Sequence, residues 1–263
     1  MKIALLFIKK DFWEDSSYKF SFFVKVFKII FVISVLFYFS DFIESQGYYH
    51  GKVSLFEYLF IGHLFYQFLI SNLKKSGSKI ILEQYKGTLE LLFNTSVSPY
   101  LLMFYSNLYN SIFNYILVNI YIFLGVVFFD LSVHFTFISY LEFNIALLVI
   151  YLYLFAWGMI GASITLIIKK SDPLSSALMY YFTIAGSLYF PNDILPKWIN
   201  FFNIFFPISK SVNLIRNILY KNIFNYNDFL ILSLHLLVIL FISVSLFNYS
   251  VKLARKYNSL STY

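Results

Sequence analysis

The ionisable side chains of this sequence are few, and their spacing limits the chemistry they could support. The four histidines are His50, His63, His134 and His235, and no two of them lie one helical turn apart. A local metal site is therefore not expected, although distant ligands could converge in space. The sequence contains no cysteine, which excludes disulfides, thiolate metal ligands and cysteine nucleophiles. No nucleophile, base and orienting partner occur at a recognisable spacing, which disfavours an enzyme.

Amides and one histidine stand within otherwise apolar segments. Asn107, Asn110 and Asn114 follow one another at spacings of three and four residues, and Gln67 follows His63 by four. Such spacings place side chains on one face of a helix. Polar groups in a membrane-spanning helix line a pathway or bond to a neighbouring helix. Both roles stay open for the asparagines, whereas for His63 a bond to a neighbouring helix is favoured over ligand binding.

The segments that hold these residues are membrane spans by composition and length. Hydrophobic residues make up 60% of the chain and charged residues 13%, and the mean hydropathy is +0.73, outside the range of soluble globular domains. Charged islands separate apolar runs of about 20 residues, the length that a helix needs to cross a bilayer. We therefore expect an all-α integral membrane protein with one domain over residues 1–263. Its six predicted transmembrane helices cover residues 20–40, 55–73, 100–129, 145–168, 174–190 and 229–247.

The distribution of basic residues predicts the orientation of these spans. With both termini in the cytoplasm, fifteen of the twenty Lys and Arg residues and six of the thirteen acidic residues fall inside. The inside pieces then carry a net charge of +9 and the outside pieces −2, as the retention of basic residues on the cytoplasmic side requires. Lys25 and Lys28 lie within the first span and can extend to the lipid headgroups. The formal net charge of +7 is thus explained without a nucleic-acid partner.

The cytoplasmic loop 74–99 is predicted to contain one amphipathic helix over residues 79–93. Charged residues recur at helical spacing on one face: Lys79, Glu83, Lys86 and Glu90. Apolar residues recur at helical spacing on the other side: Ile81, Tyr85, Leu89 and Leu92. These spacings are typical of a helix with one solvated face. Ser98 and Pro99 resemble an N-cap and first residue of the third span.

Two further segments are predicted to lie at the membrane surface. Residues 191–227 are interrupted by prolines, which break helical hydrogen bonding, and their longest apolar run, INFFNIFF, is too short to span a bilayer. We expect a re-entrant or interfacial pair of helices there, with an apolar stripe at Ile208, Val212, Ile215 and Leu219. The N-terminal segment 1–19 either lies flat as an amphipathic helix or simply extends the first span.

Two stretches of the sequence resemble the permeases of ABC type-2 transporters. The first, EQYKGTLELLFNTSVSP, resembles the cytoplasmic segment before their third span, and its matching positions are Glu83, Gly87, Thr88, Leu89, Glu90, Ser98 and Pro99. The second, YFPNDILPKWINFFNIFFPISKSVNLIRNIL, resembles the region between their fifth and sixth spans, and its matching positions are Pro191, Leu195, Pro196, Trp198, Pro207 and Arg216. The resemblance extends over essentially the whole chain.

The resemblance implies the membrane subunit of an ATP-driven exporter, paired with a second permease chain in the plasma membrane. The helix over 79–93 would then be a coupling helix that contacts a separate ATP-binding subunit through Glu83, Lys86, Gly87, Thr88 and Glu90. An outer gate would be shaped by Pro191, Pro196, Trp198, Pro207 and Arg216. The substrate would be amphipathic, lipid-like or drug-like, and alternating access would move it outward.

The sequence contains no phosphate-binding Gly-x-x-x-x-Gly-Lys-Ser/Thr loop. We therefore expect no enzymatic activity and no cofactor on this chain itself, and ATP with Mg²⁺ on the partner subunit. An ATP-independent secondary transporter is the alternative, and a membrane-embedded transferase is less favoured.

Overall fold

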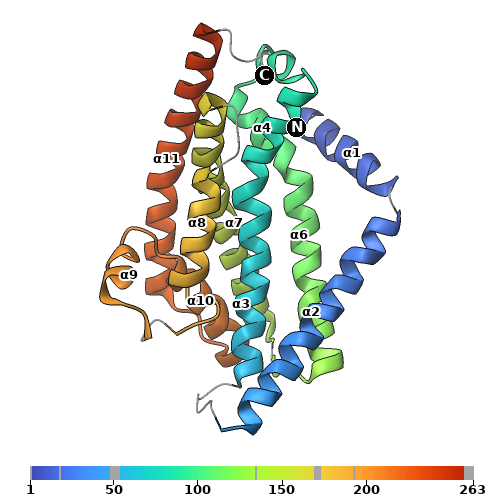
Figure 1. Ribbon diagram of the computed structural model, residues 1–263, viewed down its shortest axis with the longest axis vertical. Coiled ribbons are helices and arrows are strands. Elements are labelled where there is room, and N and C mark those ends of the chain that lie inside the picture. Colours follow the sequence, from blue (N-terminus) through green and yellow to red (C-terminus); the bar gives the residue numbers. More distant parts are fainter. Residues whose placement is uncertain are drawn as a thin grey trace.

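The structure, a computed structural model, describes residues 2–17, 19–47, 54–133, 135–168, 173–191 and 194–257. Its regular elements are helices, and no strand occurs among these residues, which confirms the predicted all-α class. The helices form one elongated bundle (Figure 1). In chain order they are α1 (Lys2–Ser16), α2 (Lys19–Ser45), α3 (Leu55–Leu69), the π-helix η1 (Ile70–Lys74), α4 (Lys75–Tyr85), α5 (Leu89–Phe93), α6 (Pro99–Phe129), α7 (Phe137–Ile168), α8 (Pro173–Ala185), α9 (Lys197–Phe202), α10 (Ile208–Lys221) and α11 (Tyr226–Lys256).

Four helices are long and apolar enough to cross a membrane. They are residues Phe23–Ser45 of α2 and the whole of α6, α7 and α11. These helices match the predicted spans 20–40, 100–129, 145–168 and 229–247, although α7 begins eight residues earlier than its predicted span. Four such helices are consistent with a multi-pass membrane protein.

The two other predicted spans, 55–73 and 174–190, do not form single helices of spanning length. The π-turn η1 interrupts the first of them, so that α3 itself has only 15 residues. Helix α8 has 13 residues and is about 20 Å long at 1.5 Å per residue, shorter than the hydrocarbon core of about 30 Å. The prediction of six spans is therefore corrected to four. The physical reasons are the π-turn and the end of α8 at Ala185, after which Ser187 adopts a positive φ of 58°.

Helix α7 forms the centre of the bundle. Two-thirds of its most apolar window is buried, against about a fifth or less for the other three candidate spans. Its residues Phe143, Ile150, Tyr153 and Leu154 are fully buried in the main core. At Gly158 the backbone of η1 approaches so closely that a Cβ atom would lie 2.6 Å from the Asn72 carbonyl oxygen. A glycine at this position thus allows α7 to pack against the π-turn.

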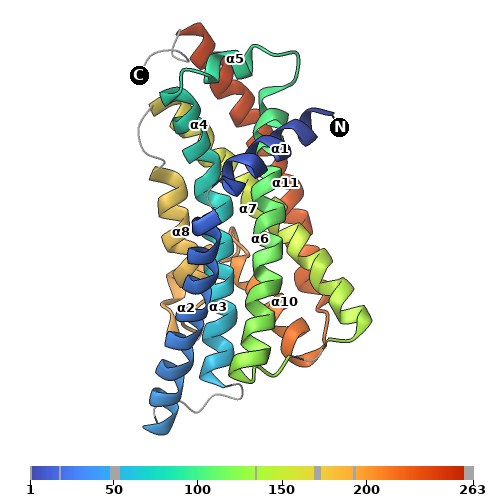
Figure 2. The same ribbon diagram turned by 90° about the vertical axis from the view of Figure 1, so that its right-hand side faces the viewer.

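The ends of the bundle differ in the elements they carry. Helices α1, α4 and α5 and the C-terminal end of α11 gather at one end, whereas the C-terminal ends of α2 and α6 lie at the other, which also carries α10 (Figures 1 and 2). Helix α1 lies across the bundle and packs against α6, where the ring of Phe12 meets Tyr109 at 6.5 Å between centroids. The predicted cytoplasmic segments therefore share one end.

Local signals set the start of α6 as predicted. The Ser98 hydroxyl accepts a hydrogen bond from the Leu101 N–H at 3.4 Å, and Pro99 is the first residue of α6. This confirms the N-cap expected at the start of the third span.

The segment 191–227 folds, in its described part, as the two short helices α9 and α10. Its predicted apolar stripe is fully buried, at Ile208, Val212, Ile215 and Leu219.

Candidate functional site

The loop 74–99 contains an elbow, which we define as residues 75–93, in place of the single helix predicted over 79–93. Helix α4 ends at Tyr85, and Gly87 adopts φ +67°, a left-handed conformation that favours glycine. The N–H of Thr88 donates to the Glu83 carbonyl and that of Gly87 to the Gln84 carbonyl, both at 3.0 Å. These two bonds form a Schellman motif, which terminates the helix. The predicted helix is wrong at this point because its periodicity continues across a helix-terminating glycine.

Part of the predicted charged face of the elbow turns toward the protein. The Glu83 side chain is 16% exposed, lies 3.8 Å from the Lys10 ammonium and accepts a hydrogen bond from the Thr88 hydroxyl. The Lys79 ammonium lies 3.0 Å from the Asp11 carboxylate and also donates to the Ser106 carbonyl. Glu83 and Lys79 thus attach the elbow to α1 and α6. Of the predicted contact residues, Thr88 is partly buried in this turn.

The outer surface of the elbow carries both charged and apolar side chains. Lys86, Gly87 and Glu90 are exposed, as are Tyr85 at 67% and Leu91 at 72%. We call Leu82, Tyr85, Lys86, Glu90 and Leu91 the elbow surface. The elbow surface therefore exposes apolar side chains beside charged ones at this end of the bundle.

The inner side of the elbow packs on the bundle. Leu89 and Phe93 of α5 are 1% exposed and belong to a core cluster with Tyr100 of α6 and Phe247 of α11. The Arg255 guanidinium, in the last turn of α11, donates to the Phe93 carbonyl at the end of α5. A cation at a helix C-terminus is stabilising because the carbonyl groups there carry partial negative charge.

The predicted gate residues differ in exposure and in their contacts. Pro191, Pro196 and Trp198 are exposed, whereas Pro207 is buried and precedes α10 as its N-cap residue. The Arg216 guanidinium donates to the Tyr58 carbonyl at 3.1 Å and to the Leu188 carbonyl at 3.2 Å. Arg216 therefore joins α10 to α3 and to the chain that follows α8.

Aromatic rings and carbonyls complete this junction around Arg216. Its guanidinium carbon lies 3.8 Å from the centroid of the Tyr58 ring, a cation–π contact. The Tyr58 hydroxyl donates to the Ser187 carbonyl at 2.9 Å, and the Tyr220 hydroxyl donates to the Glu57 carbonyl at 2.8 Å. These contacts join α3, α10 and the chain that follows α8 at the predicted outer end of the bundle.

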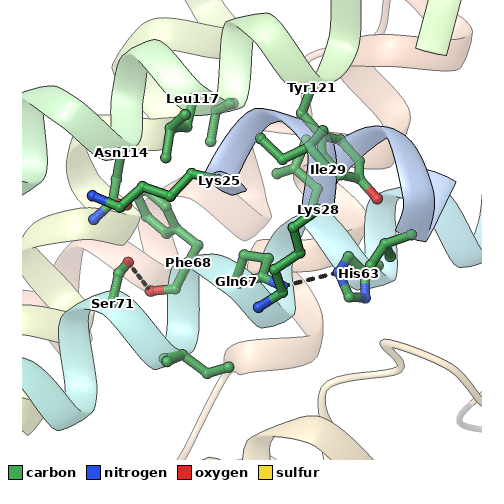
Figure 3. A pocket seen from close by; sticks show the side chains of 14 residues that line it. Lys25, Lys28, Ile29, His63, Gln67, Phe68, Ser71, Asn114, Leu117 and Tyr121 are labelled. Carbon is green, nitrogen blue, oxygen red and sulfur yellow. Dashed lines mark hydrogen bonds between the residues drawn. The ribbon is translucent and has the colours of Figure 1, made fainter. Parts of the chain in front are cut away.

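A cavity of about 190 Å³ lies between α2, α3 and α6 (Figure 3). It is lined by three of the predicted polar residues, His63, Gln67 and Asn114, and also by Lys25 and Lys28. Both lysines are predicted to extend to the lipid headgroups, and in the structure they form part of the cavity wall. The sequence could have indicated that both lysines line one site, because they lie three residues apart within an apolar span. Residues at this spacing lie on the same face of a helix.

Hydrogen bonds fix His63 on the cavity wall. The Gln67 amide lies 3.0 Å from Nε2 of His63, and the Tyr189 hydroxyl lies 3.2 Å from Nδ1. With Gln67 donating to Nε2, Nδ1 carries the proton and donates to Tyr189, which assigns a neutral imidazole. Tyr189 follows α8, so this bond joins α3 to the segment after α8. The His63 ring also stacks near Tyr121, with 6.1 Å between centroids.

The predicted asparagine stripe on α6 separates into three roles. The Asn107 amide donates to the Met103 carbonyl of its own helix at 2.9 Å. Asn110 lies between helices, where it accepts a hydrogen bond from the Lys75 ammonium and donates to the Ser71 carbonyl at 3.4 Å. Asn114 faces the cavity. Among the described residues, no group of three or more His, Cys, Asp and Glu side chains could hold a metal ion.

Comparison with known proteins identifies no family. No family model matches the sequence, and no curated protein is significantly similar to it.

Proposed function

We propose that this chain is the permease subunit of an ATP-driven ABC exporter of the type-2 class, and that the elbow contacts a separate ATP-binding subunit. The elbow surface supports this proposal, because it presents apolar side chains such as Leu91, 72% exposed, at one end of a membrane bundle. Because Lys86 and Glu90 accompany them, the surface suits a water-soluble partner better than the lipid.

The connection between the elbow and the bundle suits a mechanical role. Helices α3, η1 and α4, of 15, 5 and 11 residues, follow one another without a break. Together they form a rod about 46 Å long at 1.5 Å per residue, which connects the elbow to the interior of the bundle.

Force applied to the elbow would reach the middle of the bundle through this rod. The π-turn packs against Gly158 of the central helix α7, and π-turns are local departures from helical geometry that often mark functional sites. Binding of ATP between two partner subunits would move the elbow and tilt α3 relative to α7, which is the rigid-body movement that alternating access requires.

The orientation belongs to the same proposal. The elbow, α1 and the basic last turn of α11, with Arg255 and Lys256, share one end of the bundle. Basic residues near span ends stay in the cytoplasm. We therefore place this end on the cytoplasmic side of the plasma membrane, and α9 and α10 on its outer side. An amphipathic substrate would then move outward, through a pair of identical or different permease chains.

The test is purification of the tagged chain from its native membrane in a mild detergent, followed by identification of bound proteins and an ATPase assay. Expected is a subunit with a phosphate-binding loop in about equal amount. The variant Glu90→Lys/Leu91→Lys should retain less than a tenth of this partner, because it reverses one charge and inserts another on the elbow surface. A suitable control is Trp198→Lys, which adds a charge at an exposed site on the predicted outer side.

Two results would contradict the proposal. One is a chain that is purified without any nucleotide-binding partner, which would favour an ATP-independent secondary transporter. The other is equal recovery of the partner with the elbow variant and the control. Glu83 is a poor choice for this experiment, because its contacts with Lys10 and Thr88 stabilise the elbow itself.

A further inference from the structure

We propose that His235 of α11 is a proton-dependent clasp for residues 197–205. Its protonated ring holds this segment against α11, and its neutral ring weakens the attachment. The segment consists of α9 and the turn that follows it, and we call it the outer flap. This inference goes beyond the proposed function, because it concerns the opposite end of the bundle from the elbow and requires no ATP-binding subunit.

Both ring nitrogens of His235 face carbonyl oxygens. Nε2 lies 3.2 Å from the Ile204 carbonyl oxygen of the outer flap, and Nδ1 lies 2.9 Å from the Ile231 carbonyl oxygen, one turn earlier in α11. A carbonyl oxygen only accepts hydrogen bonds, so each contact requires an N–H group on the ring. The protonated imidazole has two N–H groups, whereas the neutral imidazole has one. The geometry therefore fits the protonated ring.

A second polar attachment joins the outer flap to α8. The Asn203 amide donates to the Ala185 carbonyl at 3.2 Å, and its oxygen accepts a hydrogen bond from the Tyr181 hydroxyl at 3.3 Å. Neither an amide nor a phenol changes its charge near neutral pH. The outer flap is thus attached to α8 independently of protons, and its attachment to α11 through His235 depends on them.

Much of the apolar surface of the outer flap lies away from the bundle. Figure 1 shows α9 at the left-hand edge of the bundle. The side chains of Trp198, Phe201 and Phe205 are 57% to 63% exposed. A segment with few buried apolar contacts opens at a low free-energy cost. One hydrogen bond therefore contributes a large share of the attachment of the outer flap to α11.

Loss of the proton leaves the Ile204 carbonyl in an unfavourable place. His235 lies six residues after the predicted start of its span at residue 229, about 9 Å along the helix, so the contact lies within the apolar layer. When the ring is neutral, its remaining proton can sit on Nδ1, and the Ile204 carbonyl then has no donor. Lipid cannot supply one, so the turn moves toward water. Acidification consequently favours the attached flap.

No charged side chain among the described residues contacts the His235 ring, whose polar contacts are the two carbonyl groups. On the helices that pack against α11, Lys210 pairs with Asp228 at 3.1 Å, and Arg216 donates to the Tyr58 and Leu188 carbonyls. Helix α6 contains no charged residue. The remaining charged groups of α7, α9 and α10 also lack a contact with the ring, namely Glu142, Lys197 and Lys221. Protonation of the ring itself is therefore the charge change that acts on both carbonyl contacts.

The experiment follows a fluorescent probe on the outer flap of the full chain in lipid nanodiscs. Because the chain has no cysteine, Phe205→Cys labelled with bimane places one polarity-sensitive probe beside Ile204. The pH is lowered from about 8 to about 5, the range in which histidine changes its charge. The emission maximum should shift to shorter wavelength in one sigmoidal step, because the attached flap withdraws the probe from water.

Two substitutions of His235 in the labelled protein test the clasp. His235→Leu has no donor and should keep the long-wavelength emission of pH 8 at every pH. His235→Gln has an amide that donates without titrating, so its emission should not change with pH. The matched control is His63→Gln, which removes a histidine that bonds to Gln67 and Tyr189 instead, and it should retain the full step.

Asn203→Ala provides a second measurement, because it removes the attachment that does not depend on protons. The pH step should become larger in this variant, since His235 then carries more of the attachment. Adding His235→Leu to Asn203→Ala should abolish the step. Thermal unfolding of each labelled protein verifies that the bundle is folded.

Three outcomes would overturn the proposal. A full step in His235→Leu would assign the titration to another group. A folded His235 protein with no step, or with a shift to longer wavelength on acidification, would show that protonation does not hold the outer flap. Loss of the step in His63→Gln would indicate a general response of the bundle to pH. All these measurements use the chain alone, so failure here and failure of the exporter proposal are distinguishable.

Discussion

Gly62 of α3 and the carbonyl group of Leu188 are in such close contact that a Cβ atom on Gly62 would lie 1.8 Å from the carbonyl oxygen. The three residues 187–189 that follow α8 all contact α3 here. The Ser187 carbonyl accepts from Tyr58, and the Tyr189 hydroxyl meets His63. Because the Leu188 carbonyl also accepts a hydrogen bond from Arg216, this short segment connects α3 to α10. Through Tyr189 and His63 it also connects the junction around Arg216 to the wall of the cavity.

Gly62→Ala should therefore destabilise the protein strongly. The added methyl group meets backbone rather than a flexible side chain, so α3 and the 187–189 segment must move apart. Overpacking of this kind costs about 1–3 kcal/mol or more. The measurement is the thermal unfolding of the detergent-purified protein. Gly47→Ala is the control, since it adds the same methyl group where nothing lies within 4 Å, although at φ +72°. Equal stability of the two variants would refute the close contact.

Arg216→Ala should lower stability because it leaves the Tyr58 and Leu188 carbonyls without their charged donor. Hydrogen bonds to charged groups contribute about 1.5–3 kcal/mol. Arg216→Lys should recover only part of this, because one ammonium group cannot reproduce the planar guanidinium that also stacks on Tyr58. Thermal unfolding of both variants, with the exposed Lys221→Ala as control, tests the junction. Full recovery by lysine would show that charge alone matters.

The stability of the elbow should depend on pH through Lys79. Burial lowers the pKa of Lys79 below its ordinary value of 10.5, an effect that the nearby Asp11 carboxylate partly opposes. The unfolded chain then binds this proton more strongly than the folded protein does. Stability consequently rises as pH increases from the lowered folded-state pKa toward 10.5. The free-energy cost of burying the charged Lys79 ammonium is fully present at pH below that folded-state pKa.

The comparison of wild type with Lys79→Met isolates this effect, because all other titrating groups are shared. The wild type should gain stability relative to the variant as the pH rises toward the ordinary lysine pKa of 10.5. Melting temperatures across this range provide the measurement. A difference between the two proteins that stays constant with pH, or falls, would show that burial does not dominate at Lys79.

The orientation can be tested directly because the chain lacks cysteine. In single-cysteine variants, Lys197→Cys at the start of α9 should react with a membrane-impermeant thiol reagent in intact cells. Glu90→Cys on the elbow should react only in inverted vesicles or after permeabilisation. Both native side chains are exposed, so access through the membrane is the variable that differs. The opposite labelling pattern would reverse the proposed orientation.

Much of the architecture could be predicted from the sequence, because it depends on composition and local spacing. Apolar length determined the four candidate spans, Ser98 and Pro99 determined the start of α6, and residues 208–219 of α10 bury the stripe that their spacing indicated. Each of these features depends on residues within one or two helical turns of one another. The stop at Gly87 was equally local, and the prediction missed it by following periodicity alone.

The tertiary structure alone decided which helix face meets which neighbour. Spacing placed Glu83 on a charged face, but the position of α1 turned it toward Lys10. Spacing likewise put Lys25 and Lys28 on one side of α2, but the packing of α2 on α3 and α6 placed them in a cavity with Asn114 and Tyr121. Helical periodicity fixes the relative directions of side chains within one helix. The rotation of that helix against its neighbours depends on contacts between residues far apart in the chain, such as Gly62 and Leu188.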